Sequence, residues 1–296
     1  MEIGLHLPEV ERVVRWNEIR DLCRVAEDVG FDSLWVPDHL VYRDNEGAST
    51  GPWECWSMLS AVAAVTSRVA IGPLVLCTSF REPGLIAKMA ATLDEISDGR
   101  LVLGLGAGWN RTEYDAFGFP YETRFGQFRE AFHIISTLLR DGQIDFEGCY
   151  YTLRDCEIRP RGPRPEGPPL LIGSKGSQVL RMTLPHVSYW NGWARWWGND
   201  VARVGPLLEE VDQAAREAGR DPTGIQKTVA MFVRLNGGLE PDDPGAPYLE
   251  GSNDRIVEEL KGYSDRGIQH VQIVLDPITT DGIERFGAIL EQFRGS

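Results

Sequence analysis

Two histidines occupy positions from which a side chain could carry out proton chemistry. His6 lies near the end of the apolar run 2–8, and His39 lies near the end of the run 31–40. An imidazole can donate or accept a proton near neutral pH, because its ordinary pKa lies close to neutrality. We predict structural roles for the other histidines, which fall inside a helix or at the beginnings of strands: His133, His186 and His270.

A second feature with chemical potential is a row of glycines that follows a buried strand. The apolar run from Leu101 to Leu105 is continued by glycines at alternate positions and then by Trp109 and Asn110. A glycine has no Cβ, so a flat ligand can approach the backbone closely there. The sequence therefore predicts the floor of a binding site, formed by Gly104, Gly106 and Gly108.

A third candidate is the glycine- and serine-rich turn that follows the apolar run 169–172. Gly173, Ser174 and Gly176 are small residues at the beginning of a predicted helix, and Lys175 adds a positive charge. Backbone amides at a helix N-terminus attract phosphate. An ordinary turn between a strand and a helix remains an equally open interpretation.

Tryptophans near strand ends could form the walls of a pocket for a flat conjugated ligand. The candidates for the substrate pocket are Trp53, Trp109 and Trp193.

The elements that would position these residues alternate between strand and helix along most of the chain. This rhythm predicts an α/β protein whose strands are parallel, and eight of them indicate a closed (β/α)₈ TIM barrel. In such a barrel the C-terminal ends of the strands share one face, which brings His6, His39 and the glycines together. The expected strands are 3–7, 32–36, 69–76, 101–105, 170–173, 186–191, 227–235 and 270–275.

A doubly wound open sheet is the main alternative architecture. It normally has Gly-x-Gly-x-x-Gly after its first strand, whereas here Gly-x-Gly-x-Gly follows the fourth. We expect a single domain over 1–296, with an insertion at about 141–169, after the fourth βα unit. This segment contains a predicted hairpin and a proline-rich connector.

Bulk properties exclude several classes of function. The formal net charge of −14 over 296 residues disfavours nucleic acid and anionic membranes as partners, since both are polyanions. No His-x-His pair suggests a metal site, and no run of about 20 apolar residues suggests a membrane span. The five cysteines include no Cys-x-x-Cys pair, which favours a reducing compartment and a cytoplasmic protein.

Four motifs carry a resemblance to a known family. They read GFDSLWVPDHL (30–40), FREPGLIAKMAATLDEISDGRLVLGLGAGWNRTEYDAFGFP (80–120), FEGCYYTL (146–153) and PPLLIGSKGS (168–177). The chain resembles the bacterial luciferase-like flavin and deazaflavin oxidoreductases, and within them the group that uses coenzyme F420. The resemblance implies a (β/α)₈ barrel with an insertion, usually found as a homodimer. Helices after the second and third strands, with Trp56 and Met58, are our candidates for its interface.

The resemblance also assigns roles to individual positions. His39 matches the histidine beside the cofactor ring, and Gly106 and Asn110 match contacts to the cofactor from the fourth strand. A bulge behind the ring, commonly with a non-proline cis peptide, is implied at Val75, Leu76 and Cys77. The loop with Gly173, Ser174, Lys175 and Gly176 would hold the cofactor phosphate.

Two departures from the family pattern are visible. Relatives that oxidise a sugar phosphate carry a catalytic glutamate on the loop after the fourth strand, where this chain has Ala107 and Gly108. That activity is therefore not expected. The common Ala-Asp-Gly-Trp-Asn segment reads Val-Ser-Tyr-Trp-Asn at 187–191, so one usual acid is absent.

The expected function is hydride transfer between coenzyme F420 and an unidentified small organic substrate, with His39 and His6 handling the proton. An FMN-dependent monooxygenase supplied with reduced flavin by a separate reductase is the close alternative. A non-catalytic cofactor-binding barrel is the second alternative. Substrate choice is expected to depend on the loops 41–52, 193–199 and 237–252.

Overall fold

The structure is a computed structural model that describes residues 1–44, 46–236, 238 and 247–295. Most of the predicted substrate loop 237–252 lies outside the described residues. The main sheet is parallel, and its strands run in the order β5-β2-β1-β14-β12-β11-β10-β7-β6. The strands on this path are β1 (Glu2–His6), β2 (Ser33–Val36), β5 (Ala70–Pro73), β6 (Leu76–Cys77), β7 (Leu103–Gly106), β10 (Leu170–Gly173), β11 (Tyr189–Trp193), β12 (Gln226–Arg234) and β14 (Ile268–Asp276).

The sheet curls into a nearly closed barrel, which confirms the predicted fold. The strands at the two ends of the sheet are β5 and β6, which follow each other directly in the sequence. Both lie next to β7 or to the residues just before it. β6 pairs with β7, and an isolated parallel bridge joins Ile71 to Leu101 next to β5. The predicted strand 69–76 is therefore interrupted, and a cis peptide bond between Leu74 and Val75 lies within the interruption.

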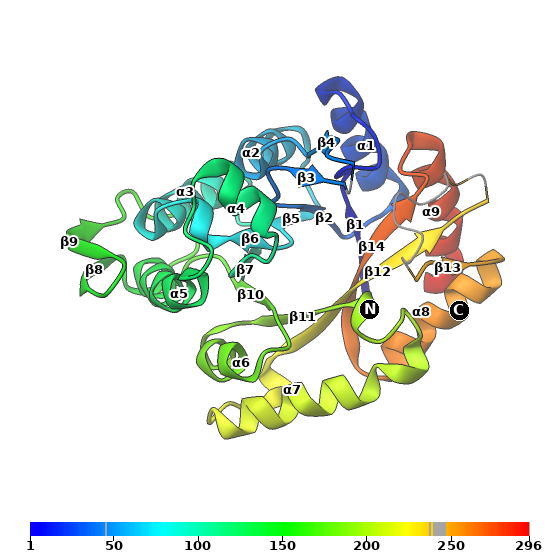
Figure 1. The fold of residues 1–296 in the computed structure, drawn as a ribbon. Helices are drawn as coiled ribbons and strands as arrows, with labels where there is room; N and C mark the ends of the chain where they lie inside the picture. The colour runs from blue at the N-terminus through cyan, green and yellow to red at the C-terminus, as the bar shows by residue number, and fades with distance from the viewer. Residues whose placement is uncertain (45, 237, 239–246, 296) are drawn as a thin grey trace.

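Helices lie around the outside of the strands (Figure 1). Helix α1 illustrates why: its apolar side chains recur on one face, where Ile19, Leu22 and Ala26 are buried, and Gly30 ends it in the left-handed conformation. The helices are α1 (Trp16–Val29), α2 (Cys55–Val65), α3 (Pro83–Ile96), α4 (Arg111–Phe117), α5 (Arg124–Asp141), α6 (Ser177–Thr183), α7 (Gly205–Glu217), α8 (Asn253–Asp265) and α9 (Thr280–Arg294).

Two short hairpins and one short strand lie outside the barrel. β3 (Tyr42–Arg43) and β4 (Ser49–Thr50) form a small antiparallel pair in the loop after β2. β8 (Gln143–Glu147) and β9 (Thr152–Glu157) form a second one at the edge of the molecule beside α5 (Figure 1). This hairpin occupies the segment predicted as an insertion. β13 (Leu249–Glu250) pairs with the end of β12.

One predicted strand was misplaced. The strand expected at 186–191 is β11, which begins at Tyr189, while His186 lies before it in the short 3₁₀ helix Leu184–His186. The apolar and aromatic residues continue from one element into the other, so alternation alone did not show the boundary. His270 behaves as predicted: it is buried near the start of β14, and its Nε2 lies 2.8 Å from Ser33 Oγ.

Side chains fill the interior of the barrel at its N-terminal end, so this part of the barrel is a packed core and not a pore. Trp35, Val102 and Leu171 form a buried cluster there, separate from the larger core between strands and helices. The Trp35 indole donates a hydrogen bond to Ser33 Oγ, which satisfies its polar atom. In barrels of this kind, active sites lie at the opposite face, where the strands have their C-terminal ends.

Candidate active site

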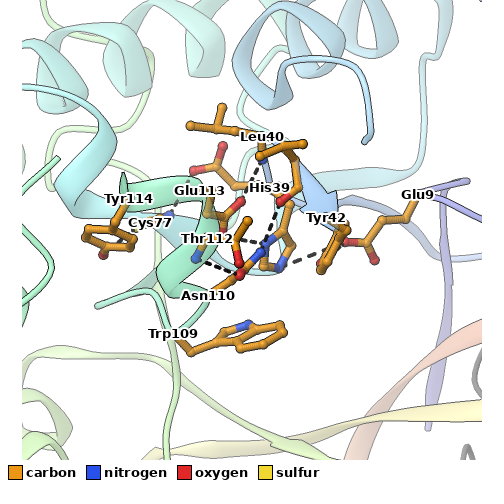
Figure 2. A network of polar contacts seen from close by, with 12 residues as sticks. Glu9, His39, Leu40, Tyr42, Cys77, Trp109, Asn110, Thr112, Glu113 and Tyr114 are labelled. Carbon is orange, nitrogen blue, oxygen red and sulfur yellow. Dashed lines mark hydrogen bonds and ion pairs between the residues drawn. The ribbon is translucent and has the colours of Figure 1, made fainter. Parts of the chain in front are cut away.

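His39 is held at the C-terminal face of the barrel by one buried carboxylate (Figure 2). Its Nδ1 lies 2.9 Å from Glu113 Oε1, and the backbone N–H of Leu40 donates to Glu113 Oε2 at 2.8 Å. Glu113 is 1% exposed. The two oxygens therefore fix both the ring and the backbone that carries it, and Nε2 of His39 is the ring nitrogen that Glu113 does not contact.

The charges around His39 favour its protonated form. Burial lowers the pKa of the imidazole, but the hydrogen bond that its Nδ1–H donates to Glu113 and the charges of Glu9, Glu113 and Asp38 outweigh it, so that the pKa is raised above its ordinary value. The raised pKa favours the imidazolium, which can donate a proton or stabilise negative charge on a neighbouring oxygen.

Asn110 explains why Glu113 reaches the histidine. It is the N-cap of α4: its Oδ1 accepts the N–H of Thr112, and its Nδ2 donates to Val41 O at 3.0 Å. The first contact begins the helix, and the second ties the loop after β7 to the loop after β2. The side chain predicted to contact a cofactor thus also has a structural role.

An aromatic and acidic wall stands beside His39. The Tyr42 hydroxyl donates to Glu9 Oε1 at 2.6 Å, and that oxygen lies 3.9 Å from His39 Nε2. The ring centroid of Tyr42 is 4.8 Å from that of His39, and the predicted pocket residue Trp109 meets His39 edge-on at 5.6 Å. Trp109 is 65% exposed, so its indole is available to cover a ligand.

The glycines of β7 and the one at the end of β10 lie against the interruption of the third strand. A Cβ on Gly104 would lie 2.3 Å from Pro73 O, and one on Gly106 would lie 2.7 Å from Val75 Cγ2. Gly173 faces the same valine, with Cγ1 at 3.2 Å from its ideal Cβ position. The chain at Pro73 and Val75 therefore fills the space beside these glycines. We infer that Val75, and not the glycines, faces the mouth of the barrel.

The residues after the interruption are anchored by a buried ion pair. Cys77 N–H donates to Asp38 Oδ2 at 2.8 Å, and Arg81 binds both oxygens of the same carboxylate at 2.8 and 2.9 Å. The Cys77 thiol lies 3.2 Å from the Tyr114 hydroxyl, and burial raises its pKa to about 12. This thiol stays protonated and is not a nucleophile. The side chain of Leu76 belongs to the main core, so only its backbone could contact a ligand.

For the other predicted residues, His6, Trp193 and Trp53, the structure gives no direct contact with His39. His6 is buried at the end of β1, and Trp193 packs against Phe232 with ring centroids 4.7 Å apart. Trp53 donates its indole N–H to Val14 O and lines a hollow of about 160 Å³ together with Glu9 and other residues of the loop after β1.

The predicted phosphate loop is exposed and internally bonded. Gly176 N–H donates to Ser174 Oγ, and Ser174 O accepts the indole N–H of Trp190. The ammonium of Lys175 lies 5.5 Å from the ring centroid of Trp196.

Glu9, Tyr42 and Glu113 were not among the residues predicted from the sequence. For Glu113 a signal was present, because it is the acid of the first turn after the N-cap Asn110 on the loop that follows the fourth strand. No comparable signal marks Glu9, which is paired with a tyrosine 33 residues away. In the described part of the chain no group of acidic, histidine and cysteine side chains is arranged to hold a metal ion.

The comparisons with known proteins identify the family of the chain. Residues 2–240 match the model of the luciferase-like monooxygenase family, and the chain belongs to that family. Within it, the chain is 38% identical over 160 residues to an F420-dependent glucose-6-phosphate dehydrogenase of Amycolatopsis mediterranei (strain U-32), covering 53% of this chain and 47% of that protein.

Two further similarities concern a second relative and a solved structure. The chain is 32% identical over 215 residues to the F420-dependent hydroxymycolic acid dehydrogenase of Mycobacterium tuberculosis (strain ATCC 25618 / H37Rv), covering 71% of this chain and 57% of that protein. It thus spans about half the length of the curated relatives it matches. A solved F420-dependent secondary alcohol dehydrogenase, in complex with an F420-acetone adduct, shares the fold with a TM-score of 0.81, 20% identity and coverage of 99% of both chains.

The search for membrane-spanning helices gave a negative result for the described residues. None of their helices combines the length and the apolar composition that a bilayer span requires.

Proposed function

We propose that this protein is a coenzyme F420-dependent oxidoreductase that transfers a hydride between the deazaflavin and a small organic substrate. The observation that carries the proposal is the His39–Glu113 pair, which places an oriented, proton-bearing ring at the mouth of the barrel. The curated relatives named above, which are F420-dependent dehydrogenases, support the choice of cofactor.

The residues at the mouth fit a flat ring. Gly106, Gly173 and the short side chain of Val75 form a surface without long side chains, and Trp109 stands exposed near its edge. Lys175 and the loop around it would hold the phosphate of the cofactor. When bound, a deazaflavin supplies a carbon that accepts or returns a hydride.

The chain's own residues supply orientation and proton handling. Glu113 holds His39 by Nδ1, so that Nε2 is the atom that can give a proton to a substrate oxygen or steady charge on it. His6, predicted to take part with His39, remains a candidate at the end of β1. Tyr42 and Trp109 limit the access of water to His39.

Titration of the protein with F420 and with FMN, followed by cofactor fluorescence, tests the cofactor. We expect F420 to bind in the micromolar range, and His39→Ala to retain that binding while losing hydride transfer in a working assay. Absence of micromolar binding for both cofactors would reject the proposal. Unchanged turnover in His39→Ala would remove His39 from the chemistry.

An FMN-dependent monooxygenase is the second candidate, favoured by the family description that the chain matches. It would require reduced flavin from a separate reductase. The two candidates differ in their reaction with oxygen: the protein would promote reoxidation of bound reduced FMN in the monooxygenase, whereas bound reduced F420 would transfer its hydride to an organic acceptor. Stopped-flow measurement of both reoxidation rates separates them.

A further inference from the structure

The hollow that Trp53 borders lies between the loop after β1 and the segment that leads into α2. Its volume is about 160 Å³, close to that of an engineered apolar cavity of roughly 150 Å³ that holds a benzene molecule in another protein. A neighbouring space that also borders Trp53 measures only about 10 Å³, which is enough for one water molecule at most. The hollow therefore has room for a group of about the size of one aromatic ring.

Most of the lining is apolar, and part of it is open to solvent. Val13 is 76% exposed and Trp53 is 48% exposed, although both border the hollow. The indole N–H of Trp53 donates to Val14 O at 2.7 Å, which fixes the ring against the loop after β1. An apolar group bound here would remove these surfaces from water, which favours binding. The other apolar side chains of the lining are Pro8, Val14, Ile19 and Pro52.

Two charged residues complete the lining, and they differ in how they are paired. Arg12 donates to both carboxylate oxygens of Glu18 and to Ile278 O, so its charge is balanced by a neighbour. Glu9 accepts a hydrogen bond at Oε1 from the Tyr42 hydroxyl, which is a neutral group. Among the described residues nothing donates a hydrogen bond to Glu9 Oε2. The hollow therefore has an acidic side with an oxygen atom available to a donor.

The charge of Glu9 is not cancelled from the side of the barrel mouth. His39 Nε2 lies 3.9 Å from Glu9 Oε1, but His39 is hydrogen bonded through Nδ1 to Glu113, whose carboxylate balances the imidazolium. One negative charge is thus left over beside an apolar hollow. A carboxylate binds an ammonium group through charge-assisted hydrogen bonds, and the face of a tryptophan ring attracts a cation.

We propose that this hollow is a second binding site, beside the mouth of the barrel, for a small amine that carries one ring-sized apolar group and a positively charged amino group. The apolar group lies against Val13 and Trp53, and the ammonium donates to Glu9. Trp53, predicted to line the substrate pocket, then serves this second site. The inference does not depend on the proposed cofactor, because none of the residues assigned to the cofactor lines the hollow.

The experiment uses fluorine NMR of the full chain labelled with 5-fluorotryptophan. The signals of Trp53 and Trp109 are assigned from the spectra of Trp53→Phe and Trp109→Phe. The probes are benzylamine, benzyl alcohol and benzoate, which share one ring and differ in charge. We expect benzylamine to shift the Trp53 signal in a saturable way, benzyl alcohol to bind at least about tenfold more weakly, and benzoate to give no saturable shift, because a hydrogen bond between charged groups is lost.

Three variants isolate the contribution of Glu9. Glu9→Gln keeps the size of the side chain and removes its charge, so it should weaken benzylamine by about tenfold and leave benzyl alcohol unchanged. Glu46→Gln, an exposed residue of the loop between β3 and β4, is the matched control and should leave both affinities unchanged. Tyr42→Phe removes a hydrogen bond to Glu9 but keeps its charge, and it should retain the preference for benzylamine.

Several results would overturn the inference: a Trp53 signal that does not saturate with benzylamine, equal affinities for benzylamine and benzyl alcohol, or a preference for benzylamine that survives in Glu9→Gln. A saturable shift of Trp109 in place of Trp53 would put the amine at the mouth of the barrel and would also reject the second site.

Binding of F420 is measured on the same samples, so that the two proposals can fail separately. Saturating benzylamine should not displace F420, and displacement would contradict a separate site. A wild type that does not bind F420 would defeat the proposed cofactor, while the Trp53 signal would still decide whether the hollow takes an amine.

Discussion

At the scale of single residues, the central finding is that one carboxylate organises the proposed catalytic histidine. Glu113 lies 74 residues after His39 in the sequence. It accepts hydrogen bonds from the His39 ring and from the backbone N–H of Leu40. This arrangement resembles the way in which a carboxylate orients an imidazole in many hydrolytic sites, where the acid fixes the tautomer and supports the imidazolium. Such a pair suits a proton-handling role.

Glu113→Gln should weaken this pair without emptying the space. The amide keeps a hydrogen-bonding partner for the ring but loses the charge, so the pKa of His39 should fall. We expect hydride transfer to drop by about 10²-fold near neutral pH, a typical contribution of general acid–base catalysis. Rates measured over a pH series check this, with Glu122→Gln as an exposed control on the neighbouring loop.

The same variant has a consequence for stability. Because folding raises the pKa of His39, its protonated form contributes to the free energy of unfolding below the ordinary histidine pKa of about 6.5, and that contribution is lost as the pH rises through the folded-state value. Urea unfolding at several pH values should show this loss in the wild type. A Glu113→Gln protein with the same pH dependence would contradict the assigned ion pair.

At the scale of elements, the interruption of the third strand is what shapes the mouth of the barrel. The chain between β5 and β6 turns into the interior, and glycines on β7 and β10 leave the room for it. The alternate glycines that suggested a ligand-binding floor are therefore explained in the first place by packing within the protein, because they leave room for the chain between β5 and β6. The ion pair between Asp38 and Arg81 then ties the chain after β6 to the loop that carries His39.

Gly104→Ala tests the fit between these elements. The new Cβ would lie 2.3 Å from Pro73 O, a backbone atom that cannot rotate away, so the strand must shift. We expect a loss of about 1–3 kcal/mol in the free energy of unfolding, as for other overpacked interiors, together with weaker cofactor binding. Gly205→Ala, where no atom lies within 4 Å of the new Cβ, is the control for chemical denaturation. Equal stability of the two variants would contradict the packing described.

At the scale of the whole molecule, the shape of the barrel and its net charge restrict the kind of ligand that the protein can bind. Access from the C-terminal face and a net charge of −14 favour a small ligand at the mouth over a polyanion on the surface. Homodimer formation remains a prediction from the family resemblance. Of the two residues suggested for the interface, Trp56 is only 7% exposed and belongs to the core of its own chain.

Trp56→Ala separates these two roles. If Trp56 serves the core, the substitution should cost about 3–5 kcal/mol of unfolding free energy, as for other buried aromatic residues, while the folded fraction keeps the wild-type assembly state. Sedimentation velocity, combined with urea unfolding, measures both. We expect a dimer for the wild type; a monomer at micromolar concentration would reject that expectation. A stable but dissociated Trp56→Ala protein would restore Trp56 to the interface.

The sequence by itself determined the architecture and indicated where the candidate site lies. Hydrophobic periodicity is written in short windows, so the alternation of strands and helices, and the placement of His39 and the glycines at strand ends, could be read directly. Only the tertiary structure decided which acids meet His39 and that Val75 occupies the space left by the glycines. Such contacts join residues far apart in the chain, and they depend on strand register and loop geometry, which no local pattern encodes.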